Sequence, residues 1–218
     1  MLGNMINSQL LISGLIEHAE ACHSDTEIVS RTVEGPIHKY TLKDAANRSR
    51  KLANALDKLG LRQGDVVGTL AWNTFRHFEL YFGVSGIGCI VNTVNPRLFP
   101  EQLIYIINHA ENQYLFIDLS FVGLVESISD SLETVKGIIV LTDKENMPET
   151  KLENVMCYEE LLANESDKYV WPNFDENTAS SLCYTSGTTG DPKGVLYSHR
   201  STILHTWIVS AGNVGNVS

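Results

Sequence analysis

The residues best suited to chemistry form one run, Tyr184 to Gly194, with the sequence YTSGTTGDPKG. Glycine lets the backbone take positive φ and approach a ligand closely, and successive N–H groups in such turns form a concave anion site. Hydroxyl side chains add donors for phosphate oxygens, and a lysine adds positive charge. The residues predicted to bind a polyphosphate are Thr185, Ser186, Gly187, Thr188, Thr189, Gly190 and Lys193.

The order of residues separates this run from the Walker A motif of P-loop NTPases. That motif requires Gly-Lys-Ser/Thr after a four-residue gap, whereas here Pro192 precedes Lys193 and Gly194 follows it. A polar surface loop is the alternative interpretation. An apolar stretch, 181–184, leads directly into the run, as a strand delivering a phosphate loop would, and we therefore favour phosphate binding.

The run also resembles the signature phosphate loop of the adenylate-forming acyl- and aryl-CoA synthetases, YTSGTTGxPKG. Every fixed position matches, and Asp191 occupies the variable one. The resemblance extends from about Leu10 to Trp207 and favours the fatty-acid CoA ligase branch. Three further stretches are similar to that branch: 26–30, 95–103 and 195–201. By this resemblance, residues 1–218 form the front part of the large N-terminal, AMP-binding domain, without the C-terminal domain.

The resemblance implies an acid–thiol ligase that works in two steps. The carboxylate of a fatty acid or related acid attacks the α-phosphorus of ATP, which gives an acyl-adenylate and pyrophosphate. The thiol of coenzyme A then attacks the acyl carbon and releases AMP. The first step joins two anionic centres, so it needs Mg²⁺ and fixed donors. The loop would hold the β- and γ-phosphates, and Lys193 would offset their charge.

Other parts that the family needs lie downstream of this loop. They are the adenine-binding segment, a glutamate that supports Mg²⁺, a ribose-binding aspartate and the adenylation lysine. The chain ends at Ser218, 24 residues beyond Gly194. We therefore expect no metal ligands and an incomplete catalytic apparatus, and exposed apolar surface where the missing part would pack. The alternative is a non-catalytic remnant, or a nucleotide-binding half that needs a complementary polypeptide.

Composition narrows the class of protein. The chain has 218 residues, of which 43% are hydrophobic, enough for one domain with a core. Its net charge of −10 argues against a nucleic-acid binder. The scattered cysteines form no Cys-x-x-Cys pair, which favours reduced thiols in the cytoplasm. We see no secretory signal and no apolar stretch long enough for a transmembrane segment.

Apolar strand-like runs alternate with helical patterns. This predicts an α/β fold with a mainly parallel sheet flanked by helices, and ligands beyond the carboxyl ends of the strands. Strands are expected at 66–71, 89–94, 114–118, 137–141 and 182–185. Helices are expected at 42–59 (capped by Thr41, with Gly60 as the stop), 75–87, 100–109, from 119 through roughly 132, 159–162 and 198–210.

Several other residues have a structural and a functional interpretation. The run 83–88 has the spacing G-x-x-G-x-G, which favours close helix packing over a dinucleotide site. His199 either reaches the nucleotide side of the cleft or shapes the turn, and we favour the turn. Neither His199 nor His205 belongs to a metal-binding pattern. Trp72 and Tyr81 are expected in the core or in a cleft wall.

Overall fold

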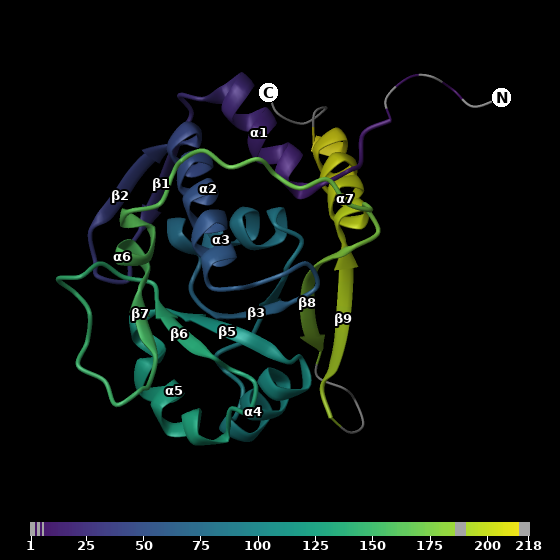
Figure 1. Cartoon of the computed structure of the whole chain (residues 1–218). Coiled ribbons are helices and arrows are strands. Elements are labelled where there is room, and N and C mark those ends of the chain that lie inside the picture. Colours follow the sequence, from purple (N-terminus) through teal and green to yellow (C-terminus); the bar gives the residue numbers. More distant parts are fainter. Residues whose placement is uncertain (1–2, 4, 6, 186–190, 214–218) are drawn as a thin grey trace.

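The computed structural model describes residues 3, 5, 7–185 and 191–213. They form a seven-stranded sheet with helices on both faces, and a two-stranded hairpin beside it (Figure 1). The large sheet has the strand order β7-β6-β5-β3-β4-β8-β9. Adjacent strands of this sheet run parallel, except that β8 and β9 pair in the antiparallel direction. The bounds are β3 (Val66–Leu70), β4 (Ile90–Thr93), β5 (Asn112–Ile117), β6 (Gly137–Val140), β7 (Val155–Cys157), β8 (Ala179–Thr185) and β9 (Lys193–Ser198).

The helices divide between the two faces of the sheet. In Figure 1, α1, α2 and α3 lie on one side and α4 and α5 on the other. The short helix α6 packs against α2, and α7 follows β9. The bounds are α1 (Ile12–His23), α2 (Leu42–Lys58), α3 (Phe75–Gly86), α4 (Pro100–His109), α5 (Val122–Ile128), α6 (Tyr158–Ala163) and α7 (His199–Asn213).

Each face of the sheet has its own apolar core. Successive side chains of a strand point to opposite faces, so in β5 Phe116 packs with α2 and α3 while Leu115 and Ile117 pack with α4 and α5. All three side chains are fully buried. Strands buried on both faces are typical of parallel sheets covered by helices. The predicted α/β fold with a mainly parallel sheet is confirmed.

The helix boundaries follow from local chemistry. Thr41 and Asp44 form the capping box that starts α2: the Asp44 backbone N donates to Thr41 Oγ1 at 3.2 Å, and the Thr41 N donates to Asp44 Oδ2 at 2.9 Å. Gly60, with φ +85°, follows the end of that helix and takes the left-handed conformation that glycine tolerates. Pro100 occupies the first position of α4, where its missing N–H costs no helical bond.

Five elements were not predicted from the sequence. These are α1, the hairpin strands β1 (Glu27–Arg31) and β2 (Ile37–Thr41), the short strand β7, and β9. β9 follows β8, which corresponds to the last strand predicted from the sequence, and the two strands form an antiparallel hairpin. Apolar residues of the β1–β2 hairpin face solvent, for example Val29 at 54% exposure, so the sequence has no clear alternation there.

A buried ion-pair network joins elements far apart in sequence. Arg48 of α2 lies 2.7 Å from Glu79 of α3 and donates two hydrogen bonds of 2.9 Å to Glu159 of α6. Arg76 of α3 donates to the same Glu159 and to Glu34, both at 2.8 Å. Glu34 lies in the turn between β1 and β2, so the network fixes this hairpin and α6 against α2 and α3. Buried charges of this kind require such partners.

Two further findings concern the predicted environment. Among the described residues, no helix is both long and apolar enough to cross a bilayer. The four cysteines, all in the described part, are free thiols. Cys89 and Cys157 are buried, and burial raises the pKa of the Cys89 thiol to about 12.

Candidate functional site

The predicted phosphate-binding run lies across the turn of the β8–β9 hairpin. Tyr184 pairs with Gly194, and Thr185 pairs with Lys193, in the antiparallel register. The hydroxyl of Thr185 donates to the carbonyl oxygen of Lys193 at 3.5 Å. The structure therefore brings these two predicted site residues together where β8 ends and β9 begins. The other five predicted residues, 186–190, lie outside the described residues.

This end of the hairpin lies beside the carboxyl end of a parallel strand. β8 pairs in parallel with β4, with Thr93 opposite Cys183. The Thr93 Oγ1 and Cys183 Sγ atoms are 3.3 Å apart. Ligands of open α/β sheets bind beyond the carboxyl ends of the strands. Thr185 and Lys193 thus occupy the edge at which this fold class places its ligands.

The side chains at this position suit an anion. Lys193 is exposed, and within the described ranges no carboxylate forms an ion pair with it. A free ammonium and a hydroxyl are the donor types that phosphate oxygens accept. Within the same described part, no group of three or more His, Cys, Asp or Glu side chains is arranged to hold a metal ion.

Tyr184, the residue before Thr185, has a partner that sequence reasoning missed. Its hydroxyl oxygen lies 2.6 Å from Nδ1 of His109, at the end of α4. The two rings meet edge to face, with centroids 5.8 Å apart. The two residues are 75 positions apart, so the sequence carries no local signal for this contact.

His199 does not reach the candidate site. It is fully buried, its ring packs edge to face on Phe174, and its Nδ1 accepts a hydrogen bond from the Ile12 backbone N at 3.1 Å. Burial lowers the pKa of His199 to about 4, so the ring is neutral near pH 7. The residue joins α7 to the start of α1, which is a structural role. His205 is exposed on α7.

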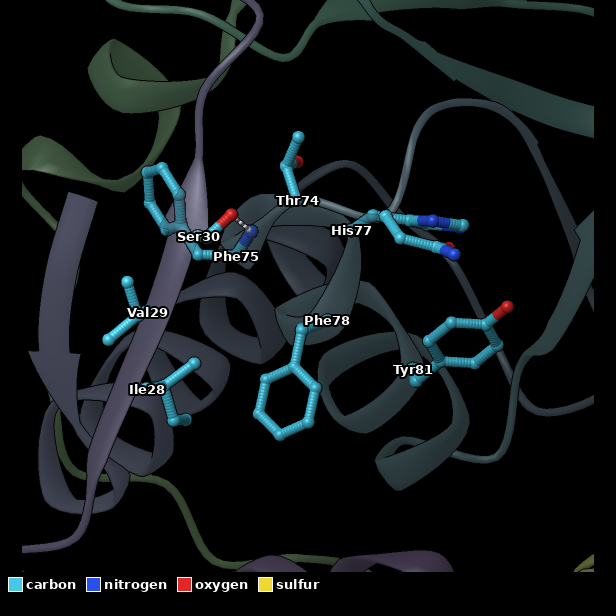
Figure 2. Close-up of a pocket in the computed structure, with 9 residues that line it drawn as sticks. Ile28, Val29, Ser30, Thr74, Phe75, His77, Phe78 and Tyr81 are labelled. Carbon is cyan, nitrogen blue, oxygen red and sulfur yellow. Dashed lines mark hydrogen bonds between the residues drawn. The ribbon is translucent and has the colours of Figure 1, made fainter. Parts of the chain in front are cut away.

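A cavity of about 260 Å³ lies between β1 and α3 (Figure 2). The side chains of Ile28, Phe78 and Tyr81 line it, so Tyr81 is a cleft-wall residue as predicted. His77, also in the wall, is within 3.3 Å of Thr69 Oγ1 through Nε2, and burial lowers its pKa to about 4. The lining is mostly apolar and carries no charged group.

Trp72 lies outside this cavity. Its indole N–H donates to Ser120 Oγ at 3.3 Å, and its backbone N donates to Asp118 Oδ2 at 2.6 Å. The side chain is 43% exposed and packs beside Phe121. Trp72 therefore caps the carboxyl end of β3 at the surface instead of filling the core.

The glycines at 83–88 have the packing role predicted for them. A Cβ on Gly83 would come within 2.5 Å of the Leu52 side chain, and one on Gly86 within 2.4 Å of Trp171. Glycine therefore lets α3 approach α2 and the segment that carries Trp171. No part of this run opens a helix towards a ligand, which agrees with the packing interpretation.

The comparisons with known proteins agree with this arrangement. A family model described as AMP-binding enzyme matches residues 16–215. A 3-methylmercaptopropionyl-CoA ligase of Ruegeria lacuscaerulensis is 49% identical over 98% of this chain and 40% of its own length. A medium-chain-fatty-acid–CoA ligase of Ectopseudomonas oleovorans is 45% identical over 100% of this chain and 40% of its own length. The chain thus spans about 40% of the length of these curated relatives.

Solved structures share the fold. The anthranilate CoA ligase AuaEII, in complex with anthranoyl-AMP, superposes with a TM-score of 0.77 at 24% identity, covering 92% of this chain and 37% of its own. An acyl-CoA synthetase of Brucella canis gives a TM-score of 0.73 at 19% identity, covering 92% and 36%. At these identities the superpositions establish the fold alone. Because the family model matches residues 16–215, nearly the whole of this chain, the chain belongs to the AMP-binding enzyme family.

Proposed function

We propose that this chain is the N-terminal portion of an ATP-dependent acyl-CoA synthetase that acts on a fatty acid or a related carboxylic acid. The observation that carries the proposal is the position of Thr185 and Lys193, paired where β8 ends and β9 begins, beside the carboxyl end of β4. The names of the relatives, which are CoA ligases, support the same reaction. A cytoplasmic location is part of the proposal.

In the proposed reaction the acid's carboxylate oxygen attacks the α-phosphorus of ATP. The bond from the α-phosphorus to the bridging oxygen breaks, and pyrophosphate leaves. Lys193 would offset the charge that grows on the leaving phosphates, and Thr185 would donate a hydroxyl hydrogen bond. By the sequence pattern, Ser186, Gly187, Thr188, Thr189 and Gly190 would add further donors. The thiol of coenzyme A then displaces AMP to form the thioester.

The residues described here suit the phosphates better than a metal. We assign no residue of this chain to Mg²⁺, which would enter with ATP and supply charge neutralisation in the first step. We also propose that the chain alone does not complete adenylation, because the adenine, ribose and adenylation groups are not among its assigned residues. Binding of nucleotide phosphates is the part of the chemistry that this chain's residues can perform.

A second candidate is a nucleotide-binding half that needs a complementary polypeptide. It is favoured by the exposed apolar surface at the β9 end of the sheet. β9 is an edge strand, and edge strands and apolar patches are where other chains attach. Six side chains of β9 and α7, each at least 40% exposed, form this surface: Val195, Leu196, Tyr197, Trp207, Ile208 and Val209.

Acid-dependent ATP–pyrophosphate exchange tests these proposals. The isolated chain is expected to show no exchange, and a mixture with the C-terminal remainder of the E. oleovorans relative is expected to restore it. Lys193→Ala in the mixture should then lower the rate about 10²–10³-fold, as for loss of one electrostatic contact to a transition state. Lys151→Ala is the matched control, because Lys151 is an exposed lysine beside β7, at the opposite edge of the sheet.

The outcomes separate the candidates. Strong exchange by the isolated chain would contradict its proposed incompleteness. If the chain binds Mg-ATP but the mixture shows no exchange, the binding half without ligase activity is the better description. If the chain shows neither ATP binding nor, in the mixture, any exchange, both candidates are contradicted.

A further inference from the structure

The β8–β9 hairpin has little support at the end that carries Thr185 and Lys193. β9 is the last strand of the sheet, and within the described part it pairs only with β8. Its residues from Lys193 to Tyr197 are all exposed. On the β8 side, the Thr93–Cys183 contact lies two residues before Thr185. Tyr184, between Cys183 and Thr185, makes the side-chain contact with another element that lies nearest to this end among the described residues.

Tyr184 reaches across this end to a well-packed helix. Its hydroxyl oxygen lies 2.6 Å from His109 Nδ1 and donates the hydrogen bond when that nitrogen carries no proton. His109 is the last residue of α4 and stacks on Tyr105, with ring centroids 5.1 Å apart. Three residues of α4 anchor the helix in the core of its face with at most 1% exposure: Leu103, Ile106 and Ile107.

The opposite strand is shaped to admit the same ring. Gly194 is the cross-strand partner of Tyr184. A Cβ on Gly194 would lie 3.2 Å from the Tyr184 ring and 3.0 Å from the Leu182 side chain. An aromatic ring that covers a glycine on the neighbouring strand is a known way to fix the register of an edge. Tyr184 therefore contacts β9 through its ring and α4 through its hydroxyl.

We propose that the Tyr184–His109 hydrogen bond is a positioning contact for phosphate binding. It fixes the end of the hairpin against α4, and so sets where Thr185 and Lys193 present their donors at the sheet edge. His109 acts through Tyr184 and is a positioning residue, not a catalytic one. This inference rests on the proposed function, because the donors matter only if phosphates bind there.

Tyr184→Phe isolates the hydrogen bond from ring packing, because it removes the hydroxyl and keeps the ring over Gly194. His109→Ala removes the acceptor together with the imidazole ring. His109→Gln keeps an acceptor on a side chain of similar reach and serves as the rescue variant. Tyr105→Phe is the matched control, because the Tyr105 hydroxyl has no hydrogen-bond partner among the described residues, although its ring stacks on His109.

Two measurements on the 218-residue chain test the proposal. Mg-ATP affinity by calorimetry should weaken about two- to tenfold in Tyr184→Phe and His109→Ala, the range for one hydrogen bond. The double variant should be no weaker than either single one, since both remove the same bond. Amide hydrogen exchange in 193–198 should quicken by a similar factor, while exchange in 66–70 stays unchanged. His109→Gln and Tyr105→Phe should behave as the unchanged chain.

The two readouts keep the inference separate from the proposed function. Unchanged affinity and unchanged exchange in Tyr184→Phe would overturn the positioning role. Loss of affinity that is additive in the double variant would overturn it too, because it would mean two independent contacts. If the unchanged chain binds no Mg-ATP, the proposed function fails, and the exchange measurement still decides whether the contact fixes the hairpin.

Discussion

The middle of the sheet and its β8–β9 end are built on different principles. All four residues of β6 are buried, because helices cover both faces of the central strands. In β9, by contrast, five of six residues are exposed, although three of them are apolar. The central strands gain their stability from burial, whereas the hairpin depends on backbone pairing and a few side-chain contacts. Thr185 and Lys193, the predicted phosphate-binding residues that the structure describes, thus lie in the region that the core supports least.

Removing one core side chain should give the largest effect and the sharpest contrast. Phe116 is fully buried in β5 and packs edge to face on Tyr158. Phe116→Ala should lower the free energy of unfolding by about 3–5 kcal/mol, because it leaves a cavity. Leu196→Ala, at a site 60% exposed in β9, should change it by less than about 0.5 kcal/mol.

Urea unfolding followed by circular dichroism measures both variants. Similar losses in the two variants would contradict the distinction between the regions. It would mean that the exposed face of β9 is covered in solution.

His199, which directly follows β9, tests whether the β8–β9 side of the sheet has a buried part of its own. Its pKa falls from an ordinary 6.5 to about 4 through burial. As the pH drops below 6.5, the unfolded chain takes up a proton at this residue while the folded chain does not. Stability therefore decreases between pH 6.5 and 4, by up to about 2–3 kcal/mol.

The variant His199→Asn isolates this contribution. Asparagine keeps an acceptor for the Ile12 N–H but does not titrate. Glu79 and Asp118, whose pKa values burial raises to about 7 and about 6, titrate with the opposite sign and cancel in the difference between the two proteins. That difference in unfolding free energy should shrink as the pH is lowered from 6.5 to 4. A difference independent of pH would contradict the buried, neutral imidazole.

Glycine substitutions compare packing in the two regions. Gly83→Ala should cost about 1–3 kcal/mol, because the new Cβ would lie 2.5 Å from the buried Leu52 side chain. Gly194→Ala should cost less, because its contacts at 3.0–3.2 Å are with Leu182 and Tyr184, and the latter is half-buried and able to shift.

Gly14 is the control for this pair. It lies in α1 with nothing within 4 Å of a new Cβ, so Gly14→Ala should stabilise by up to about 1 kcal/mol. Thermal unfolding orders the three variants. A larger loss at Gly194 than at Gly83 would reverse the comparison.

The same contrast explains what the sequence allowed us to predict. α4 has the predicted bounds, because Pro100 marks its start and the apolar spacing is helical. The position of the candidate loop after a strand was also predictable, since an apolar run precedes it. β9 was not, because its apolar side chains lie on both faces without alternation. The Tyr184–His109 contact and the Arg48–Glu159 ion pair join residues 75 and 111 positions apart, and only the folded topology brings them together.

The smallest expected effect on stability comes from the exposed apolar surface of β9 and α7. Leu196→Lys and Ile208→Lys, at sites 60% and 71% exposed, should change the unfolding free energy by less than about 0.5 kcal/mol. They should nevertheless reduce self-association, because exposed apolar side chains on and beside an edge strand favour pairing with another chain. Sedimentation velocity over a range of concentrations measures this.

Val170→Lys is the matched control, because Val170 is 93% exposed but lies outside that surface, in the segment between α6 and β8. Equal reduction of association by Val170→Lys would mean that added charge alone keeps the chains apart. A monomeric unchanged chain would mean that the apolar side chains of β9 and α7 are tolerated in water. In the expected case, Leu196→Lys and Ile208→Lys keep the unfolding free energy and reduce self-association. This result would show that the exposed apolar side chains of β9 and α7 drive association without contributing to the stability of the core.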